Sequence, residues 1–332
     1  MTFPTTSRPD RPARPRGVRR WAGAAAVVVA STLALAACSD DATPVSDETG
    51  TATEEPQPSE SSTEEPGSAS PAESPTESPE PTDSASESPA ASGTAVPLYF
   101  AGDGPGGRTV LFREFQRVEG DPLTEAARLV AGGGQPDDPD YRTLWPGVDI
   151  ASVQATDGVL LVEIPSDGFT DRPDGMSRRD AKLALQQLVR TLQGVQQERV
   201  PVQVQREGGA PLFGLPTETP FEAASVLRTL NLVNITSPAE GDAVTGQTLT
   251  VTGVANSFEA SGPCRLLQDG QEVAIEPYQT EAWMEDRLFP FEVDLPLGDV
   301  SGEVVVQCET DDPSGGAEGN GPAVDTKTVT VQ

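Results

Sequence analysis

Histidine is absent from this chain of 332 residues, and basic residues are few. Without histidine the chain has no Ser-His-Asp triad, no histidine-paired cysteine nucleophile and no histidine metal site. Lys and Arg number 22 against 52 Asp and Glu, which gives a formal net charge of −30. Proteins that bind nucleic acids neutralise phosphates with Lys and Arg, so this balance excludes a nucleic-acid partner.

Long apolar runs are also missing, apart from one near the start. Residues 21–37 carry no charge and follow an arginine-rich segment. The run ends in LAAC, residues 35–38, which resembles the lipobox of bacterial lipoproteins. The pattern predicts a signal peptide, residues 1–37, whose removal leaves Cys38 as a lipid-modified first residue that carries palmitate. We therefore expect a mature protein anchored by lipid to the extracytoplasmic face of the cell membrane.

Two alternatives for this segment stay open. A retained transmembrane anchor would need about 20 apolar residues, which is slightly more than the run provides, and no basic stop-transfer cluster follows it. The pair Arg19-Arg20 also resembles a twin-arginine export signal, so export by either the general or the twin-arginine route fits the sequence.

Cysteine is rare as well, with three residues in the chain. Lipid occupies Cys38, which leaves Cys264 and Cys308. An exported protein with one such pair is expected to form a disulfide. The alternative is a pair of buried free thiols.

Residues 38–95 consist mainly of Glu, Ser, Pro and Thr, and neither Lys nor Arg occurs between Ser39 and Pro97. Such a segment has too little apolar surface to offset the entropy that ordering would remove. We expect a disordered tether that holds the folded part away from the membrane. A binding platform or an O-glycosylated stalk is the alternative.

Residues 96–215 have a globular composition and local signals for strands and helices. These signals are a proline-containing helix start, a tight hairpin turn and a capping box, at Asp121-Pro122, Asp157-Gly158 and Ser177-Asp180. Together with the apolar periodicity, they predict the order β-β-α-β-β-α-β in a two-layer α+β sandwich.

Residues 216–231 are expected to connect this domain to a second one through a short helix from Thr219 to Leu230. Residues 232–332 contain about seven short runs of strand character separated by turn residues. This pattern favours an all-β sandwich of immunoglobulin type.

Both predicted domains resemble modules of bacterial exported lipoproteins. The first is similar to the GerM N-terminal module, named for spore germination, in residues 98–100, 111–115, 121–123, 145–146, 188–192 and 202–204. The second is similar to the immunoglobulin-like domain that often follows that module, in residues 235–241, 251–255, 258–260 and 289–295. Cys264 and Cys308 depart from the usual pattern of the second domain.

The resemblance implies a non-enzymatic envelope protein that assembles or supports complexes near peptidoglycan. It attaches no catalytic residues to either module, and we expect no cofactor and no metal. The expected partners are other envelope proteins and the membrane that holds the lipid anchor. A peptidoglycan- or glycan-binding module is the alternative function, and a carboxylate-based cell-wall hydrolase is a third.

Aromatic residues in polar loops are the candidates for an interaction site. Tyr141 and Trp145 lie among aspartates in a long loop, residues 132–146. Long loops are often functional, and exposed aromatic side chains anchor proteins and sugars. Phe258 is a further candidate. Alternatively, Trp145 covers the edge of the sheet and Phe258 belongs to the core.

Acidic loops offer weaker possibilities. Residues 311–320 contain oxygen ligands and glycines, which calcium favours, but their spacing departs from the EF-hand pattern. Asp137, Asp138 and Asp140 form a similar acidic group. Paired carboxylates also hydrolyse glycosides, yet with so many acids the sequence singles out no pair. We therefore predict no metal site and no enzyme.

Overall fold

The computed structural model describes residues 92–312, 314 and 319–332. The predicted signal peptide, Cys38 and nearly all of the predicted tether lie outside the described residues. The described residues all belong to one compact unit. Within the described part, no helix is both long enough and apolar enough to cross a membrane.

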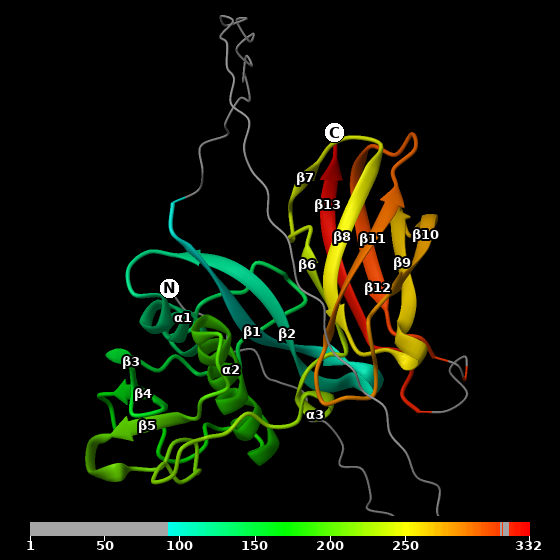
Figure 1. The fold of residues 1–332 in the computed structure, drawn as a ribbon. Coiled ribbons are helices and arrows are strands. Elements are labelled where there is room, and N and C mark those ends of the chain that lie inside the picture. Colours follow the sequence, from blue (N-terminus) through cyan, green and yellow to red (C-terminus); the bar gives the residue numbers. More distant parts are fainter. Residues whose placement is uncertain (1–91, 313, 315–318) are drawn as a thin grey trace, which may run out of the picture. The chain divides into compact units, whose positions relative to one another are not determined.

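The first domain contains its strands and helices in the predicted order (Figure 1). They are β1 (Thr94–Gly104), β2 (Arg108–Val118), α1 (Pro122–Ala131), β3 (Ser152–Thr156), β4 (Val159–Ile164), α2 (Arg178–Gln196) and β5 (Val202–Arg206). The helix starts are those that the sequence indicates. Asp121 accepts a hydrogen bond from the Thr124 N–H (2.9 Å), and Ser177 and Asp180 form a capping box.

The strands of this domain form two sheets rather than one. β1 and β2 make an antiparallel hairpin, while β3, β4 and β5 form a separate sheet in which β4 and β5 are parallel. Other segments occupy the edges of the hairpin. Ala101 of β1 exchanges two backbone hydrogen bonds with Arg142 (2.8 Å each), and the Leu111 carbonyl of β2 accepts from the Asn231 N–H (2.8 Å). These isolated bridges are the contacts that the structure shows at the two edges of the hairpin.

The core of the first domain lies between these elements. α1 and α2 pack against each other, and α2 also packs along β1. The apolar faces predicted from the helical periodicity are the buried ones, including Ala126, Ala127 and Val130 of α1 and Leu185, Leu188 and Leu192 of α2. At roughly 25 cal/mol per Å² of apolar area, this burial is the main force that holds the domain together.

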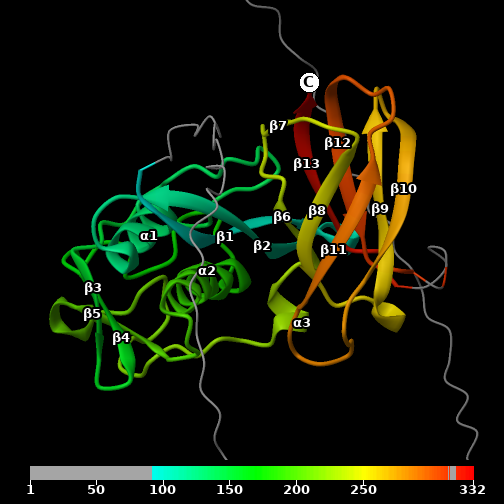
Figure 2. The ribbon, with the colours of Figure 1, turned by 45° about the horizontal axis from the view of Figure 1, so that its top comes forward.

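The second domain is a β-sandwich whose two sheets share one core (Figure 2). Its strands are β6 (Val233–Ser237), β7 (Ala243–Val244), β8 (Thr248–Ala255), β9 (Ser261–Gln268), β10 (Gln271–Gln279), β11 (Phe289–Pro296), β12 (Gly302–Glu309) and β13 (Val324–Val331). One sheet has the order β10-β9-β12-β13-β7, and the other has the order β11-β8-β6. Buried and exposed residues alternate along β11, as expected for a strand with one face on the core.

A disulfide joins Cys264 and Cys308. The two residues lie directly opposite each other on β9 and β12, so the bond links neighbouring strands of a single sheet. Both side chains are fully buried in the core of the second domain.

The segment between the domains differs from the prediction. The helix expected from Thr219 to Leu230 is limited to α3 (Val226–Thr229). The reason is an extended stretch before it, because Phe221 exchanges two backbone hydrogen bonds with Val202 of β5 (2.8 and 3.0 Å). Backbone that pairs with a strand in this way cannot also be helical.

Candidate functional site

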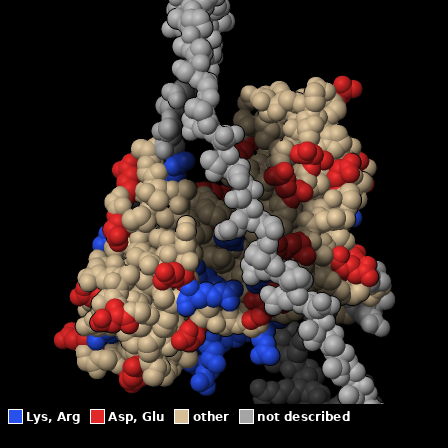
Figure 3. Space-filling model, viewed as in Figure 1, with Lys and Arg blue, Asp and Glu red and all other residues tan. Residues whose placement is uncertain are grey.

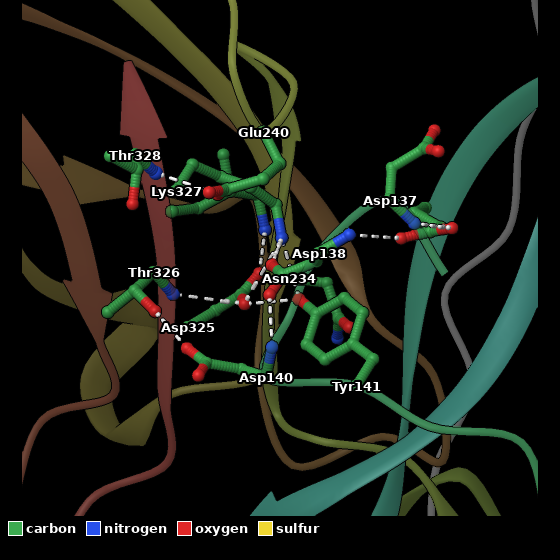
Figure 4. Close-up of polar contacts among 12 residues, drawn as sticks. Asp137, Asp138, Asp140, Tyr141, Asn234, Glu240, Asp325, Thr326, Lys327 and Thr328 are labelled. Carbon is green, nitrogen blue, oxygen red and sulfur yellow. Dashed lines mark hydrogen bonds and ion pairs between the residues drawn. The ribbon is translucent and has the colours of Figure 1, made fainter. Parts of the chain in front are cut away.

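Four buried polar side chains meet where the two domains touch (Figure 4). Asp138 and Tyr141 come from the loop between α1 and β3, and Asp325 and Lys327 come from β13. Each has at most 6% of its surface exposed. We call these residues the junction network.

The junction network is fully connected. Lys327 Nζ donates to Asp138 Oδ2 and to Tyr141 Oη (2.7 Å), and lies 3.7 Å from Asp325 Oδ1. Tyr141 Oη donates to Asp325 Oδ1 (2.5 Å). The Ile235 N–H donates to the second oxygen of Asp325 (2.6 Å). Each buried charge therefore has an opposite charge or a hydrogen-bond donor beside it, as buried ionic groups require.

Local structure explains why these side chains point toward one another. Asp325 and Lys327 are two residues apart on a strand, so both project from the same face of β13. In the loop, Asp138 Oδ1 accepts from the Asp140 N–H (2.8 Å). Buried Glu114 of β2 holds the loop by accepting from the Asp138 N–H (3.3 Å), and the Tyr141 ring stacks on Phe112 at 4.7 Å between centroids.

The charges of the network are set by burial and by their neighbours. Burial and the carboxylates of Asp325 and Asp138 raise the pKa of Tyr141 well above its ordinary value, so its hydroxyl stays protonated. Burial also raises the pKa of Asp325, although Lys327 and the Tyr141 hydrogen bond oppose this. Burial alone would lower the pKa of Lys327, but attraction to Asp325 and Asp138 is stronger, and the pKa is raised. Lys327 is therefore a charged ammonium at neutral pH.

The network joins the two domains, and two of its members, Tyr141 and Asp325, also line a cavity of about 310 Å³. Weaker contacts surround the network, such as the hydrogen bond from Thr326 Oγ1 to Asp140 Oδ2 (3.1 Å). On β2, the Arg113 N–H donates to Asn234 Oδ1 (3.0 Å), and Arg113 Nη2 donates to Thr236 Oγ1 (2.9 Å). Lys327 binds the carboxylate of Asp138, and Tyr141 and the Ile235 N–H bind the carboxylate of Asp325. These contacts join the two domains.

Two of the three predicted interaction residues do not lie on the surface. Tyr141 is buried in the junction network and contacts another part of the same chain. Trp145 is buried as well, because it is 4% exposed in the first-domain core. There it donates to the Ala184 carbonyl (2.7 Å) and packs edge-on against Phe213. The alternative, in which Trp145 covers the edge of the sheet and is not exposed, agrees better with this burial.

Phe258 differs, because 41% of its surface is exposed. Its ring packs edge-on against Trp283, with 4.9 Å between the centroids. Met284, the next residue, is 74% exposed. A small aromatic and apolar patch thus lies on the second domain, and its role in contacts remains a prediction.

Metal ligation finds little support in the part of the chain that the structure describes. No group of three or more Cys, Asp or Glu residues there could hold a metal ion. Asp138 of the acidic group is bound by Lys327 instead. Residues 313 and 315–318 of the candidate calcium loop lie outside the described residues.

Sequence reasoning missed Asp325 and Lys327. One signal was present, since the chain has only two lysines, Lys182 and Lys327, among 22 basic residues. Asp325 and Lys327 share one face of the strand with Val329 and Val331, and charged residues on an apolar face are unusual unless they are paired. The partner of Lys327, however, lies 189 positions away in the chain.

Comparisons with known proteins identify both domains. Residues 97–212 match the family described as sporulation and spore germination, and residues 232–317 match the immunoglobulin-like domain of bacterial spore germination. No curated protein matches the chain.

Two solved structures show only remote likeness. An engineered protein is 17% identical with a TM-score of 0.24, over 35% of this chain and 22% of that protein. A candidate lipoprotein from Clostridium perfringens is 13% identical with a TM-score of 0.25, over 39% of this chain and 87% of that one. The family matches are what identify the chain: it carries a sporulation and spore germination domain followed by an immunoglobulin-like domain of bacterial spore germination.

Proposed function

We propose that this chain is a lipid-anchored, non-enzymatic interaction or scaffold protein on the outer face of the cell membrane. The observation that carries the proposal is the junction network, which joins the two domains through buried charges. Two domains fixed in this way present one continuous surface of constant geometry to a partner. Such a surface suits a protein that positions other envelope proteins.

The N-terminal sequence indicates where in the cell this surface would act. Cys38 follows a lipobox-like sequence, and residues 39–96 contain many acidic residues but no Lys or Arg. A flexible chain of about 57 residues has an end-to-end distance of roughly 40–45 Å. In the proposal, this segment holds the domains within or beyond the inner layers of the cell wall.

The hydrolase alternative is weakened by how the buried carboxylates are used. A glycosidase needs one carboxylic acid and one carboxylate facing an open cleft. Asp138 and Asp325 are instead almost fully buried, and they bind Lys327 and Tyr141. Release of muropeptides from purified cell wall by the protein would restore that alternative.

The scaffold proposal is tested in the native organism by fractionation and crosslinking. The wild-type chain is expected in the membrane fraction, and Cys38→Ala is expected in the soluble fraction, because the lipid would be lost. Crosslinking of the membrane-bound chain should recover defined envelope proteins, and Cys38→Ala should recover fewer of them.

Two results would contradict this proposal. If the Cys38→Ala protein still sediments with membranes, the chain is not held there by lipid at Cys38. If the wild-type chain crosslinks to no envelope protein, it is not a scaffold. Substitution of Ser46 by Ala, which leaves Cys38 and the disulfide in place, serves as the control and should leave the membrane fraction unchanged.

A glycan-binding function is the second candidate, and the exposed Phe258–Trp283 pair favours it. Aromatic faces bind sugar rings by apolar contact. If the pair binds peptidoglycan, Cys38→Ala protein should sediment with purified cell wall, and adding Phe258→Ala should abolish most of that sedimentation. Leu227→Ala, at a side chain of similar exposure (38%), is the control and should not change it. Equal sedimentation of the Phe258 and Leu227 variants would exclude this patch.

A further inference from the structure

A cavity lined by arginines lies between the two domains and is not part of the junction network. Its volume is about 160 Å³. The lining includes four arginines, Arg113 of β2, Arg190 of α2, Arg199 after α2 and Arg287 before β11. Figure 3 shows basic side chains gathered near the middle of the face in view, with acidic side chains spread over both sides. A group of basic side chains is unexpected in a chain that has more than twice as many Asp and Glu as Lys and Arg.

The two inner arginines have unused hydrogen-bond donors. Arg190 is 9% exposed, and its Nη2 donates to the Ala224 carbonyl. Its Nε is buried and has no hydrogen-bond partner in the described residues. Arg113 is similar, because its Nη2 donates to Thr236 while its Nε is buried without a partner among those residues. A buried donor that stays unpaired destabilises the protein, so a ligand that accepts these hydrogen bonds would be favoured.

These arginines also lack carboxylate partners. In the part of the chain that the structure describes, no Asp or Glu forms an ion pair with Arg113, Arg190 or Arg199. Arg287 alone pairs, with Glu281 and Glu285 at its exposed side. Burial lowers the pKa of Arg190 and the positive charge of Arg199 adds to this, while Tyr99 and the carboxylate of Asp286 oppose it. Three of the four arginines that line the cavity therefore form no ion pair in the described part of the chain, although the carboxylate of Asp286 is near enough to attract Arg190.

We propose that this cavity binds an oxyanion group, a phosphate or a carboxylate, at the contact between the domains. Guanidinium groups bind both anions through paired hydrogen bonds, which gives geometric selectivity as well as charge. The cavity is smaller than the 300–1,000 Å³ typical of sites for drug-sized ligands, so it fits one anionic group rather than a large molecule. This inference names a ligand class that the scaffold proposal does not contain, and it does not depend on it.

The anionic group has more than one possible source. A phosphate would come from a phosphate-bearing envelope component. A carboxylate would come from a separate acidic molecule or from the acidic residues at 40–87 of this same chain. Both anions would accept hydrogen bonds from the same arginines. The experiment below therefore tests phosphate and carboxylate separately.

The test is calorimetric titration of the full chain, at low ionic strength, with inorganic phosphate and separately with acetate. One molecule of the favoured anion should bind per chain. Arg113→Lys and Arg199→Gln should each weaken binding by about tenfold or more, the loss expected for a hydrogen bond to a charged group. Arg199 is exposed, so its substitution leaves the packing intact. Arg178→Gln, at an exposed arginine of α2 outside the cavity, is the control and should bind normally.

Each outcome tests either the proposal itself or the source of the anion. Stronger binding of phosphate or of acetate identifies the class of group. Binding that emerges only after the acidic residues at 40–87 are replaced by amides shows that the chain's own carboxylates occupy the cavity. The proposal is overturned if neither anion binds to either form. It is also overturned if the Arg113 and Arg199 variants bind as strongly as the Arg178 variant.

Discussion

Replacement of Lys327 by methionine is expected to lower the free energy of unfolding by about 3–5 kcal/mol. Methionine preserves much of the length of the side chain but removes the ammonium. Asp138 and Asp325, 2% and 3% exposed, would then share a dry site with no positive charge. The penalty arises from these uncompensated buried carboxylates, and chemical denaturation of both proteins measures it.

The other lysine of the chain provides the control. Lys182 is exposed on α2, and Lys182→Met should change the free energy of unfolding by no more than about 0.5 kcal/mol. Asp138→Asn combined with Lys327→Met should cost less than the sum of the two single changes, because the residues share one network. A Lys327→Met protein as stable as the Lys182 control would show that the junction network does not hold the domains together.

The effect of Lys327 should also depend on pH in one direction. Its folded-state pKa is raised above the ordinary value of 10.5. The stabilisation is therefore fully present below the unfolded-state pKa and is lost as the pH rises through the folded-state pKa. The difference between the wild type and Lys327→Met should stay constant from neutral pH to about 10 and shrink at higher pH.

Removal of the disulfide is expected to have the second large effect, about 4 kcal/mol of unfolding free energy. Cys264 and Cys308 are 44 positions apart, so the bond closes a substantial loop in the unfolded chain. In the folded domain, β9 and β12 already hold the two residues opposite each other, and the bond acts mainly by restricting the unfolded state. Denaturation of the Cys264→Ala, Cys308→Ala protein measures this loss.

The comparison is made in the Cys38→Ala background, so that lipid and the third thiol do not interfere. The single variants Cys264→Ala and Cys308→Ala should each lose about as much as the double variant, since either one breaks the bond. A double variant within about 1 kcal/mol of its parent would show that the disulfide contributes little to stability. Reductant should reproduce the loss once partial unfolding exposes the buried bond.

Local signals in the sequence predicted much of the fold. The aspartate before Pro122, the capping box at Ser177 and the turn at Asp157-Gly158 all act within a few residues, and each forms where predicted. The alternating runs of the second domain likewise became strands. Such features depend on neighbouring residues and not on distant partners.

The site was not predictable in the same way. Tyr141 contacts Asp325 across 184 positions of sequence, and a polar loop with aspartates is more often solvated than buried. Trp145 shows the same limit, because a tryptophan in a polar loop gives no sign of whether its ring turns to solvent or to a core. The contact of Leu111 with the segment at Leu230 is likewise distant in sequence and leaves no local signal.

The central claim is that the junction network makes one unit of two domains, and calorimetric unfolding of the wild-type chain tests it most directly. A single transition is predicted, with equal calorimetric and van't Hoff enthalpies. Lys327→Met should lower its midpoint or split it into two transitions. Two independent transitions in the wild type, one of them unaffected by Lys327→Met and by loss of the disulfide, would contradict the account.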